Sequence, residues 1–297
     1  MTLRRAAALL AAAWAALAVP ARAGDLAPAA ADAAAPAAGA LEGLTAEQRE
    51  LVAEWARTTF CYCGCPHTVA QCQKEHHGCR HAARMQALAA RLVRAGAKKD
   101  ELARLVGTYY ASFDKRAKIS TAGFGPPRGS PEAPVTIVEY SDFTCPYCQL
   151  VRPVLESFVD ARPGRVKLVF KPFPIESHPG ALELAQAGEW AREQKLFWPM
   201  HDALFASPGS HSVDELALIA REVGGDPESL RDALGDGRYV PKIRASQAEA
   251  REAGIKGTPS LFLNGRPLVL MDYSEEGLEL TLQDEEEWTK YGGWQRD

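Results

Sequence analysis

The sequence predicts an α/β protein in which helices pack on the faces of a sheet. A helical insertion interrupts this part, and a small cysteine-rich helical domain precedes it. Residues 135–170 have the pattern of strand, helix and strand, and residues 180–253 that of several helices. Two short strands and a closing helix follow. This order is typical of a sheet covered by helices, while five cysteines within residues 61–79 mark the preceding helical part.

Residues 1–23 have the pattern of an export signal peptide. Arg4 and Arg5 give a positive start, residues 6–19 form an apolar run, and Ala21-Arg22-Ala23 fits a cleavage site before Gly24. The alternative is a membrane anchor, but the run is shorter than the roughly 20 residues that a spanning helix needs. We therefore expect a periplasmic or secreted protein with no stable membrane anchor.

Composition places two linkers. Residues 24–40 are almost entirely Ala, Pro, Gly and Asp, and residues 119–134 are rich in Gly and Pro. They bound a cysteine-rich helical domain at 41–118 and a second domain at 135–297. The net charge of −4 over 297 residues argues against a nucleic-acid-binding protein.

Three helices are predicted in the first domain. Thr45 and Gln48 fit a capping box that opens a helix running to about Thr58. Residues 79–95 and 99–116 carry apolar side chains at helical spacing, with Gly96 between them.

The second domain follows in order. Residues 135–140 and 166–170 are β-rich, and a helix begins at Pro146 and ends near Arg162. Breaks in the helical block are expected near Pro208, Gly224-Gly225 and Gly235. Strands at 260–264 and 267–271 form a hairpin that turns at Asn264-Gly265. A helix over 274–291 closes the chain.

Cys145 and Cys148 form a C-P-Y-C motif where a strand ends and a helix begins. The free amides and dipole of a helix N-terminus favour the thiolate form of Cys145. Pro146 fits the first helical position, where its missing N–H has no partner anyway. Cys145 is therefore the predicted nucleophile, and Cys148 is the resolving thiol that attacks the mixed disulfide.

Two other readings of this motif are less favoured. Half of a zinc site would need further ligands, but residues 149–297 contain no cysteine, and His178, His201 and His211 are loosely spaced. A purely structural disulfide is also less apt, because a small ring at a helix start suits exchange better than stapling.

Residues 130–150, with Ala133-Pro134 and Tyr140-Ser141-Asp142-Phe143 leading into C-P-Y-C, resemble the active-site stretch of DsbA-like proteins. These are the branch of thioredoxin-fold oxidoreductases that has a helical insertion. Lys171-Pro172-Phe173-Pro174, the segment 189–205 and Gly257-Thr258-Pro259-Ser260 extend the similarity over about residues 126–273. The acidic tail from Ser274 departs from it. The resemblance implies a thioredoxin fold.

The resemblance also implies roles for five residues. Pro259 is expected to be cis and to face the disulfide, with the backbone of Thr258 open to an extended substrate; the alternative is an ordinary β-edge proline. Glu139 matches a buried acid that moves protons to or from Cys148, although a plain surface glutamate is nearly as well supported. Tyr147, which together with Pro146 tunes the redox potential, offers no positive charge, so a less extreme oxidant than DsbA is expected.

The N-terminal cysteine cluster comprises Cys61, Cys63, Cys65, Cys72 and Cys79, with His67, His76, His77 and His81 among them. The C-Y-C-G-C stretch resembles an element of small exported bacterial domains. If residues 72–79 were helical, Cys72 and Cys79 would be about 10 Å apart, too far for a disulfide. Each would then bridge back to a C-x-C-x-C thiol. A disulfide-stapled helical domain is favoured; binding of Cu(I) or zinc and a second redox relay are the alternatives.

The favoured function is an exported protein-disulfide oxidoreductase, an oxidase rather than an isomerase or reductase. The alternative is a copper- or zinc-handling protein that uses the N-terminal Cys/His cluster. The expected partners are exported cysteine-containing proteins and a membrane or soluble redox partner, with no nucleic acid. No cofactor beyond the redox-active disulfide is expected, a metal at the N-terminal cysteines being the alternative.

Overall fold

A computed structural model describes residues 39–76, 79–207, 209–268 and 273–294. The predicted signal peptide and nearly all of the 24–40 linker lie outside the described residues, as do His77, Pro208 and the end of the 267–271 strand. Among the residues that are described, no helix combines the length and apolar character that crossing a bilayer requires.

A four-stranded sheet with the order β2-β1-β3-β4 forms the centre of the second domain. Strands β1 (Val135–Ser141) and β2 (Val166–Pro172) are parallel and are joined through helix α5 (Pro146–Asp160). Strand β3 (Ser260–Leu263) runs antiparallel to β1, and the short β4 (Arg266–Pro267) pairs with β3. Both long strands are almost continuously buried, as expected where helices cover both faces of a sheet.

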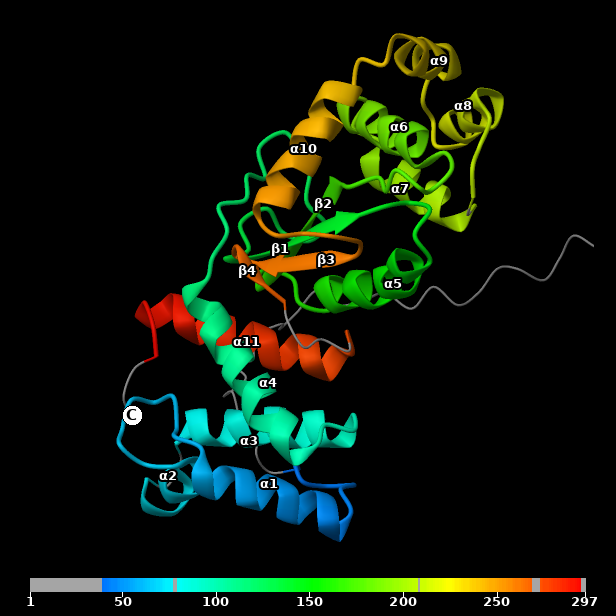
Figure 1. The fold of residues 1–297 in the computed structure, drawn as a ribbon. Coiled ribbons are helices and arrows are strands. Elements are labelled where there is room, and N and C mark those ends of the chain that lie inside the picture. The colour runs from blue at the N-terminus through cyan, green and yellow to red at the C-terminus, as the bar shows by residue number, and fades with distance from the viewer. Residues whose placement is uncertain (1–38, 77–78, 208, 269–272, 295–297) are drawn as a thin grey trace, which may run out of the picture. The chain divides into compact units, whose positions relative to one another are not determined.

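Alternate residues of β1 face different helices. Val135 and Ile137 pack in a cluster with α5 and α11 (Glu275–Tyr291). Val138 and Tyr140 pack instead with Ala250 of α10 (Val240–Glu252). Figure 1 shows α5 and α11 on one side of the sheet and α10 on the other. By the two-residue period of a strand, Glu139 belongs to the face that α5 covers.

The helical insertion follows β2. It consists of α6 (Ala181–Glu193), α7 (Phe197–Ala206), α8 (Val213–Glu222), α9 (Pro227–Asp236) and α10. Its apolar cluster contains Trp190, Phe197 and Leu204, and also Phe143 from the active-site loop and Phe170 from β2. The rings of Phe143 and Phe170 stack with centroids 4.9 Å apart. The insertion therefore supports the loop that carries the C-P-Y-C motif.

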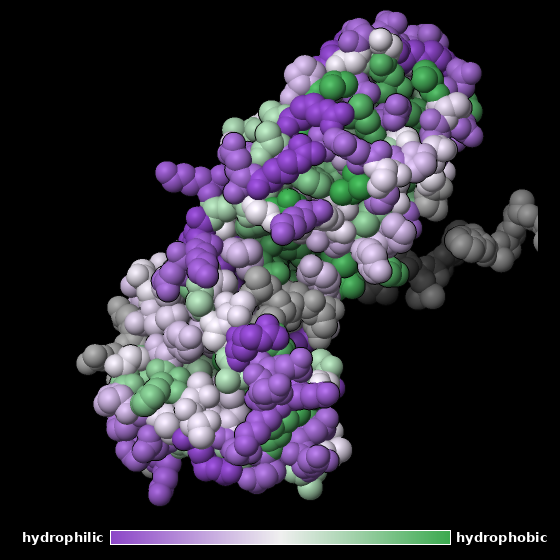
Figure 2. Space-filling model, viewed as in Figure 1, coloured by the Kyte–Doolittle hydropathy of each residue, from purple (hydrophilic) through white to green (hydrophobic). Residues whose placement is uncertain are grey.

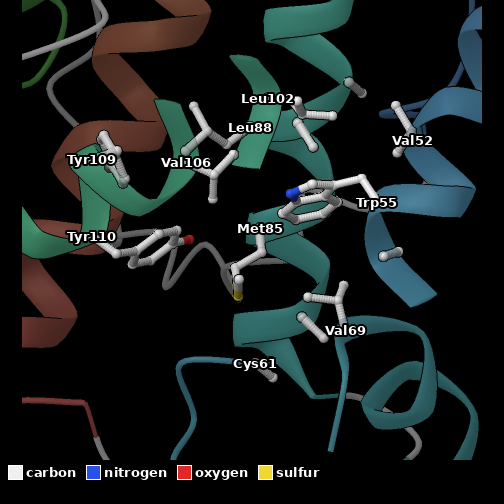
Figure 3. Close-up of a cluster of buried hydrophobic side chains, with 14 of the residues drawn as sticks. Val52, Trp55, Cys61, Val69, Met85, Leu88, Leu102, Val106, Tyr109 and Tyr110 are labelled. Carbon is white, nitrogen blue, oxygen red and sulfur yellow. The ribbon is translucent and has the colours of Figure 1, made fainter. Parts of the chain in front are cut away.

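The N-terminal helices form a second core. They are α1 (Ala46–Thr58), α2 (Val69–Glu75), α3 (Arg80–Arg94), α4 (Lys99–Ala111) and the 3₁₀ turn η1 (Ser112–Asp114). The capping box of Thr45 and Gln48 is present. Figure 3 shows Trp55, Met85, Leu102 and Val106 from three of these helices meeting in the core. The helix predicted over residues 99–116 ends at Ala111, and the 3₁₀ turn that follows it ends at Asp114.

Helix α11 belongs to both cores. Leu278 and Leu282 pack in the sheet cluster, whereas Leu280 and Trp288 pack with the N-terminal helices. The segment predicted as a Gly/Pro linker also packs closely: Phe124 is buried, and the backbone of Arg128 bridges to Leu168 of β2. On the face drawn in Figure 2, hydrophilic and hydrophobic side chains are interspersed.

The β3–β4 turn is the one that the sequence predicts. Asn264 and Gly265 have φ values of 45° and 83°, in the left-handed region. A Cβ on Gly265 would lie 2.4 Å from the carbonyl oxygen of Ala117. The backbone N–H of Ala117 donates to the carbonyl of Gly265 over 2.8 Å. The turn therefore needs glycine both for its conformation and for this close approach.

Candidate active site

Cys145 and Cys148 lie at the start of α5, just beyond the end of β1. Cys145 is the N-cap residue and Pro146 occupies the first turn. Cys145 is 4% exposed and Cys148 is fully buried. The first sulfur therefore lies nearest solvent at the helix N-terminus, and the second lies inside, as attacking and resolving thiols require.

Asp142 holds the loop between β1 and α5. Its carboxylate accepts hydrogen bonds from the backbone N–H of Thr144 (2.8 Å) and the hydroxyl of Thr144 (2.6 Å). It also accepts from the N–H of Ile175 (2.9 Å), and it lies 2.8 Å from Nδ1 of His178. Asp142 thus ties the active-site loop to the loop after β2. Sequence reasoning gave Asp142 no role, although the Asp-x-Thr spacing before a helix start is a signal for such a turn.

The loop that contains Pro259 lies beside Cys145. The Thr258–Pro259 peptide bond is cis, and the thiol of Cys145 donates to the carbonyl oxygen of Thr258 at 3.4 Å. The next residue, Ser260, pairs with Tyr140 near the end of β1. Pairing of β3 with β1 therefore brings the proline loop to the N-terminus of α5, and an isolated β-edge proline does not describe this geometry.

Glu139 is a core residue, not a surface glutamate. It is 1% exposed, and its Oε1 has no hydrogen-bond partner among the described residues. Burial raises the pKa of Glu139 to about 7; the negative charge of Glu156 adds to the rise, and Arg152 opposes it. A carboxyl with this pKa carries a proton for about half of the time near neutral pH.

The environment of Cys148 favours the protonated thiol. Burial raises the pKa of Cys148, and the negative charge of Glu139 raises it further. The Ser141 hydroxyl and the Asp142 backbone amide oppose the rise. The charge on the buried acid therefore acts electrostatically on the resolving thiol.

Replacing Glu139 with glutamine should change how stability depends on pH. The pKa of Glu139 is raised from 4.5 to about 7 on folding, so folding favours the protonated carboxyl. That advantage is complete below pH 4.5 and is lost as the pH rises through 7, a difference of about 3 kcal/mol. Glutamine does not titrate.

Denaturant unfolding of both proteins in the dithiol form, at pH 4.5 and pH 8, measures this effect. The free energy of unfolding of the Glu139→Gln variant, taken relative to that of the native chain, should be about 3 kcal/mol higher at pH 8 than at pH 4.5. Groups that titrate in both proteins cancel in this difference. An unchanged difference at the two pH values would show that Glu139 titrates normally.

Two exposed apolar side chains lie close to the pair in sequence. Tyr147 is 70% exposed and lies between the two cysteines, and Leu150 is 71% exposed and follows Cys148 by two residues. Between the thiols, Tyr147 therefore presents an aromatic ring to solvent. Both side chains are therefore accessible to solvent on the helix that begins at the pair.

Tyr273 is a neighbour of the site that sequence reasoning missed. Burial raises the pKa of Tyr273, and the negative charges of Glu139 and Cys148 add to the rise. No pattern in the sequence could have placed it there, because it follows the hairpin and its position depends on how α11 is packed.

Among the described residues, the other histidines and cysteines do not join this pair. His178 contacts Asp142, His201 contacts Asp202 and His211 contacts Ser207. The sulfurs of Cys61, Cys63, Cys72 and Cys79 lie within 4.8 Å of one another. They belong to the core of the N-terminal helices, separate from the cluster that contains Cys145 and Cys148.

The helical assumption for residues 72–79 is wrong. Helix α2 ends at Glu75 and α3 begins at Arg80, so the chain turns between Cys72 and Cys79. The backbone N–H of His76 bonds to Cys72, and that of Cys79 bonds to His76. The expected separation of about 10 Å along a helix axis therefore does not arise, and the two sulfurs come together.

Comparison with known families agrees with this geometry. Residues 121–284 match a family model described as thioredoxin. The match spans more than half of the chain and includes every strand of the sheet, both cysteines of C-P-Y-C and Pro259.

Two solved structures share the fold. BdbD from Bacillus subtilis, in its oxidised form, is 22% identical, with a TM-score of 0.51 over 57% of this chain and 96% of that one. A thioredoxin-like oxidoreductase from Silicibacter pomeroyi is 30% identical, with a TM-score of 0.50 over 59% of this chain and 99% of that one.

Curated relatives match over a shorter part. The Na(+)/H(+) antiporter NhaA 3 of Salinispora tropica is 40% identical over 141 residues, which is 47% of this chain and 21% of that protein. The NhaA 1 antiporter of Salinispora arenicola is 36% identical over a similar share. The chain thus spans about a fifth of the length of the curated relatives it matches.

Proposed function

Because the chain belongs to the thioredoxin family, we propose that it is a thiol–disulfide oxidoreductase that donates disulfides to exported cysteine-containing proteins. One observation carries the proposal: the thiol of Cys145 lies 3.4 Å from the carbonyl of Thr258, which precedes cis-Pro259. The sulfur that exchanges with substrate and a backbone segment for an extended substrate are thereby placed side by side.

The reaction begins with the Cys145–Cys148 disulfide. A substrate thiolate attacks Sγ of Cys145, the bond between the two cysteines breaks, and Cys148 leaves with the electron pair and takes up a proton. A second substrate thiolate then attacks the substrate sulfur of the mixed disulfide. Cys145 leaves as a thiolate, and two electrons have moved from the substrate to the enzyme.

Glu139 is the proton donor that this sequence of steps requires. Burial raises the pKa of Cys148, so its bare thiolate is a poor leaving group. A carboxyl whose pKa is about 7 can give its proton to Cys148 and recover it from water. In the reverse direction the same carboxylate would take the proton from Cys148 before it attacks.

The N-terminal helices support a donor rather than a dimeric isomerase. An isomerase often has a dimerisation domain, which would need an apolar face open to a second copy. The apolar face of the N-terminal helices is instead covered within the chain by Leu280, Trp288 and Trp294 of the C-terminal segment. Tyr147 brings no positive charge between the thiols, so the pair is proposed to be a moderate oxidant.

A donor must be reoxidised. We propose a membrane or soluble redox partner that accepts two electrons from the Cys145–Cys148 dithiol, and an oxidising compartment outside the cytoplasm, in which disulfides persist. Cation transport is not transferred from the NhaA relatives, because the match covers about a fifth of those proteins.

The reduction potential of the couple tests the direction. The full chain is equilibrated in glutathione buffers, and the thiols of Cys145 and Cys148 are quantified by alkylation and mass spectrometry. A donor should have a potential above the roughly −270 mV of thioredoxin and below the roughly −120 mV of DsbA. A value at or below that of thioredoxin would identify a reductant and overturn the proposed direction.

A further inference from the structure

The N-terminal core contains a buried sulfur cluster that disulfide donation does not use. Cys61, Cys63, Cys72 and Cys79 are each at most 6% exposed, and all four sulfurs lie within 4.8 Å of one another. Figure 3 shows Cys61 at the edge of this core, near Val69 and below Met85. Four sulfurs converging on one point in an apolar core form a set of ligands for a soft cation.

Three separate backbone segments bring these sulfurs together. Cys61 and Cys63 lie in a loop closed by an antiparallel bridge between Phe60 and Thr68, and by a hydrogen bond from the N–H of Cys61 to the carbonyl of His67. Cys72 lies on α2, which opens with its own capping box. Cys79 is the N-cap of α3, where its sulfur accepts from the N–H of Ala82 at 3.5 Å. A thiolate is favoured at such a helix N-terminus.

The sulfur separations fit a tetrahedral metal site. Cys61 and Cys79 are 3.9 Å apart, and Cys63 and Cys72 are 3.7 Å apart. With Zn–S bonds of about 2.3 Å, the edge of a regular tetrahedron of sulfurs is about 3.8 Å. Tetrahedral sites made of four sulfurs are typical of zinc or iron, and closed sites with four protein ligands are typical of structural zinc.

We propose that Cys61, Cys63, Cys72 and Cys79 bind one zinc ion as a closed structural site. The ion would join the 60–68 loop to α2 and to the start of α3. Structural zinc contributes directly to folding stability. The site stands apart from Cys145 and Cys148, so it can succeed or fail independently of the proposed exchange activity.

Cys65 is the thiol left over. Its sulfur lies 2.9 Å from those of both Cys63 and Cys72, too near to be a further corner of the tetrahedron. It is partly exposed, and it groups with His67 and His76 at the surface. Nε2 of His76 lies 3.0 Å from Nδ1 of His67, and Nε2 of His67 lies 3.5 Å from a carboxylate oxygen of Glu75. The competing arrangement is a disulfide that joins Cys65 to Cys63 or Cys72.

Metal analysis of the full chain, purified anaerobically under reducing conditions, tests the site. The native chain should contain one zinc ion per molecule. Cys63→Ser and Cys72→Ser should lower the zinc content at least tenfold, whereas the matched Cys65→Ser variant should keep the full ion. The Cys145→Ser variant should also keep it, which separates this test from the test of exchange.

A second measurement on the native chain covers the case in which a variant fails to fold. Alkylation followed by peptide mass spectrometry should modify Cys65 and spare the four ligands until a strong zinc chelator is added. X-ray absorption at the zinc edge should show sulfur neighbours only. Less than a tenth of a zinc ion per chain, iron or copper in its place, disulfides among the four cysteines, or zinc lost from Cys65→Ser alone would each overturn the assignment.

Discussion

Replacing Cys145 with serine is expected to abolish disulfide transfer. The hydroxyl cannot form a mixed disulfide, so the first covalent step is lost and the rate should fall at least about a thousandfold. Oxidation of a reduced peptide that contains two cysteines, followed by fluorescence or mass, measures the effect. Cys145 is the more exposed thiol of the C-P-Y-C pair and lies beside the carbonyl that precedes cis-Pro259, so no other cysteine should replace it.

The matched control is Cys65→Ser, which removes a partly exposed thiol from the N-terminal cluster. It should transfer disulfides at the native rate. Activity retained in Cys145→Ser, or lost equally in both variants, would show that the C-P-Y-C cysteines do not carry out the disulfide transfer.

The Glu285→Ala variant is expected to show the largest loss of stability. Glu285 is fully buried on α11. It accepts hydrogen bonds from Arg116 at 2.7 and 3.2 Å and from Arg266 at 3.2 Å. Arg266 is itself fully buried, with its guanidinium 3.8 Å from the ring centre of Phe113. Removing the carboxylate leaves a buried cation uncompensated, which should cost about 3–5 kcal/mol.

The neighbouring Glu286→Ala variant is its control. Glu286 is on the same helix and pairs with Arg165, but both side chains are about a third exposed. Its removal should cost less than about 1 kcal/mol. Denaturant unfolding of the two variants and the native chain measures both values. Equal losses would show that the contact of α11 with the N-terminal helices and the hairpin does not depend on the Glu285 ion pairs.

Local signals in the sequence predict much of the fold. The capping box at Thr45, the Asn264-Gly265 turn and the proline that opens α5 each specify backbone geometry within a few residues. The β-rich runs and the order of elements predict the sheet and its insertion, and these predictions are confirmed. Such features depend on neighbours in the chain, which is why a sequence reveals them.

The shared role of α11 could not be predicted in this way. Its pattern indicates a helix, but which core each face enters depends on segments more than a hundred residues away. Charged residues are normally exposed, so nothing marks Glu285 and Arg266 as buried partners.

The same distinction between local signals and long-range packing applies to the candidate site. C-P-Y-C and Thr258-Pro259 are visible as motifs, and the structure brings them together. The burial of Glu139 depends on α5 closing over β1, and the placement of Tyr273 depends on the chain beyond the hairpin. At the N-terminal cysteines, a helix assumed across residues 72–79 hid a turn that gathers four sulfurs.

Trapping of the covalent intermediate tests the central claim most directly. A Cys148→Ser variant is mixed with a substrate protein that contains a disulfide. The Cys145 thiolate attacks that bond and one substrate thiol leaves; without Cys148 the resulting mixed disulfide is not resolved, so it should accumulate. Peptide mass spectrometry then identifies the cysteine that holds the substrate. The account predicts a link through Cys145 alone, lost in the Cys145→Ser/Cys148→Ser double variant. A link through any cysteine of the N-terminal cluster, or equal trapping by the double variant, would contradict it.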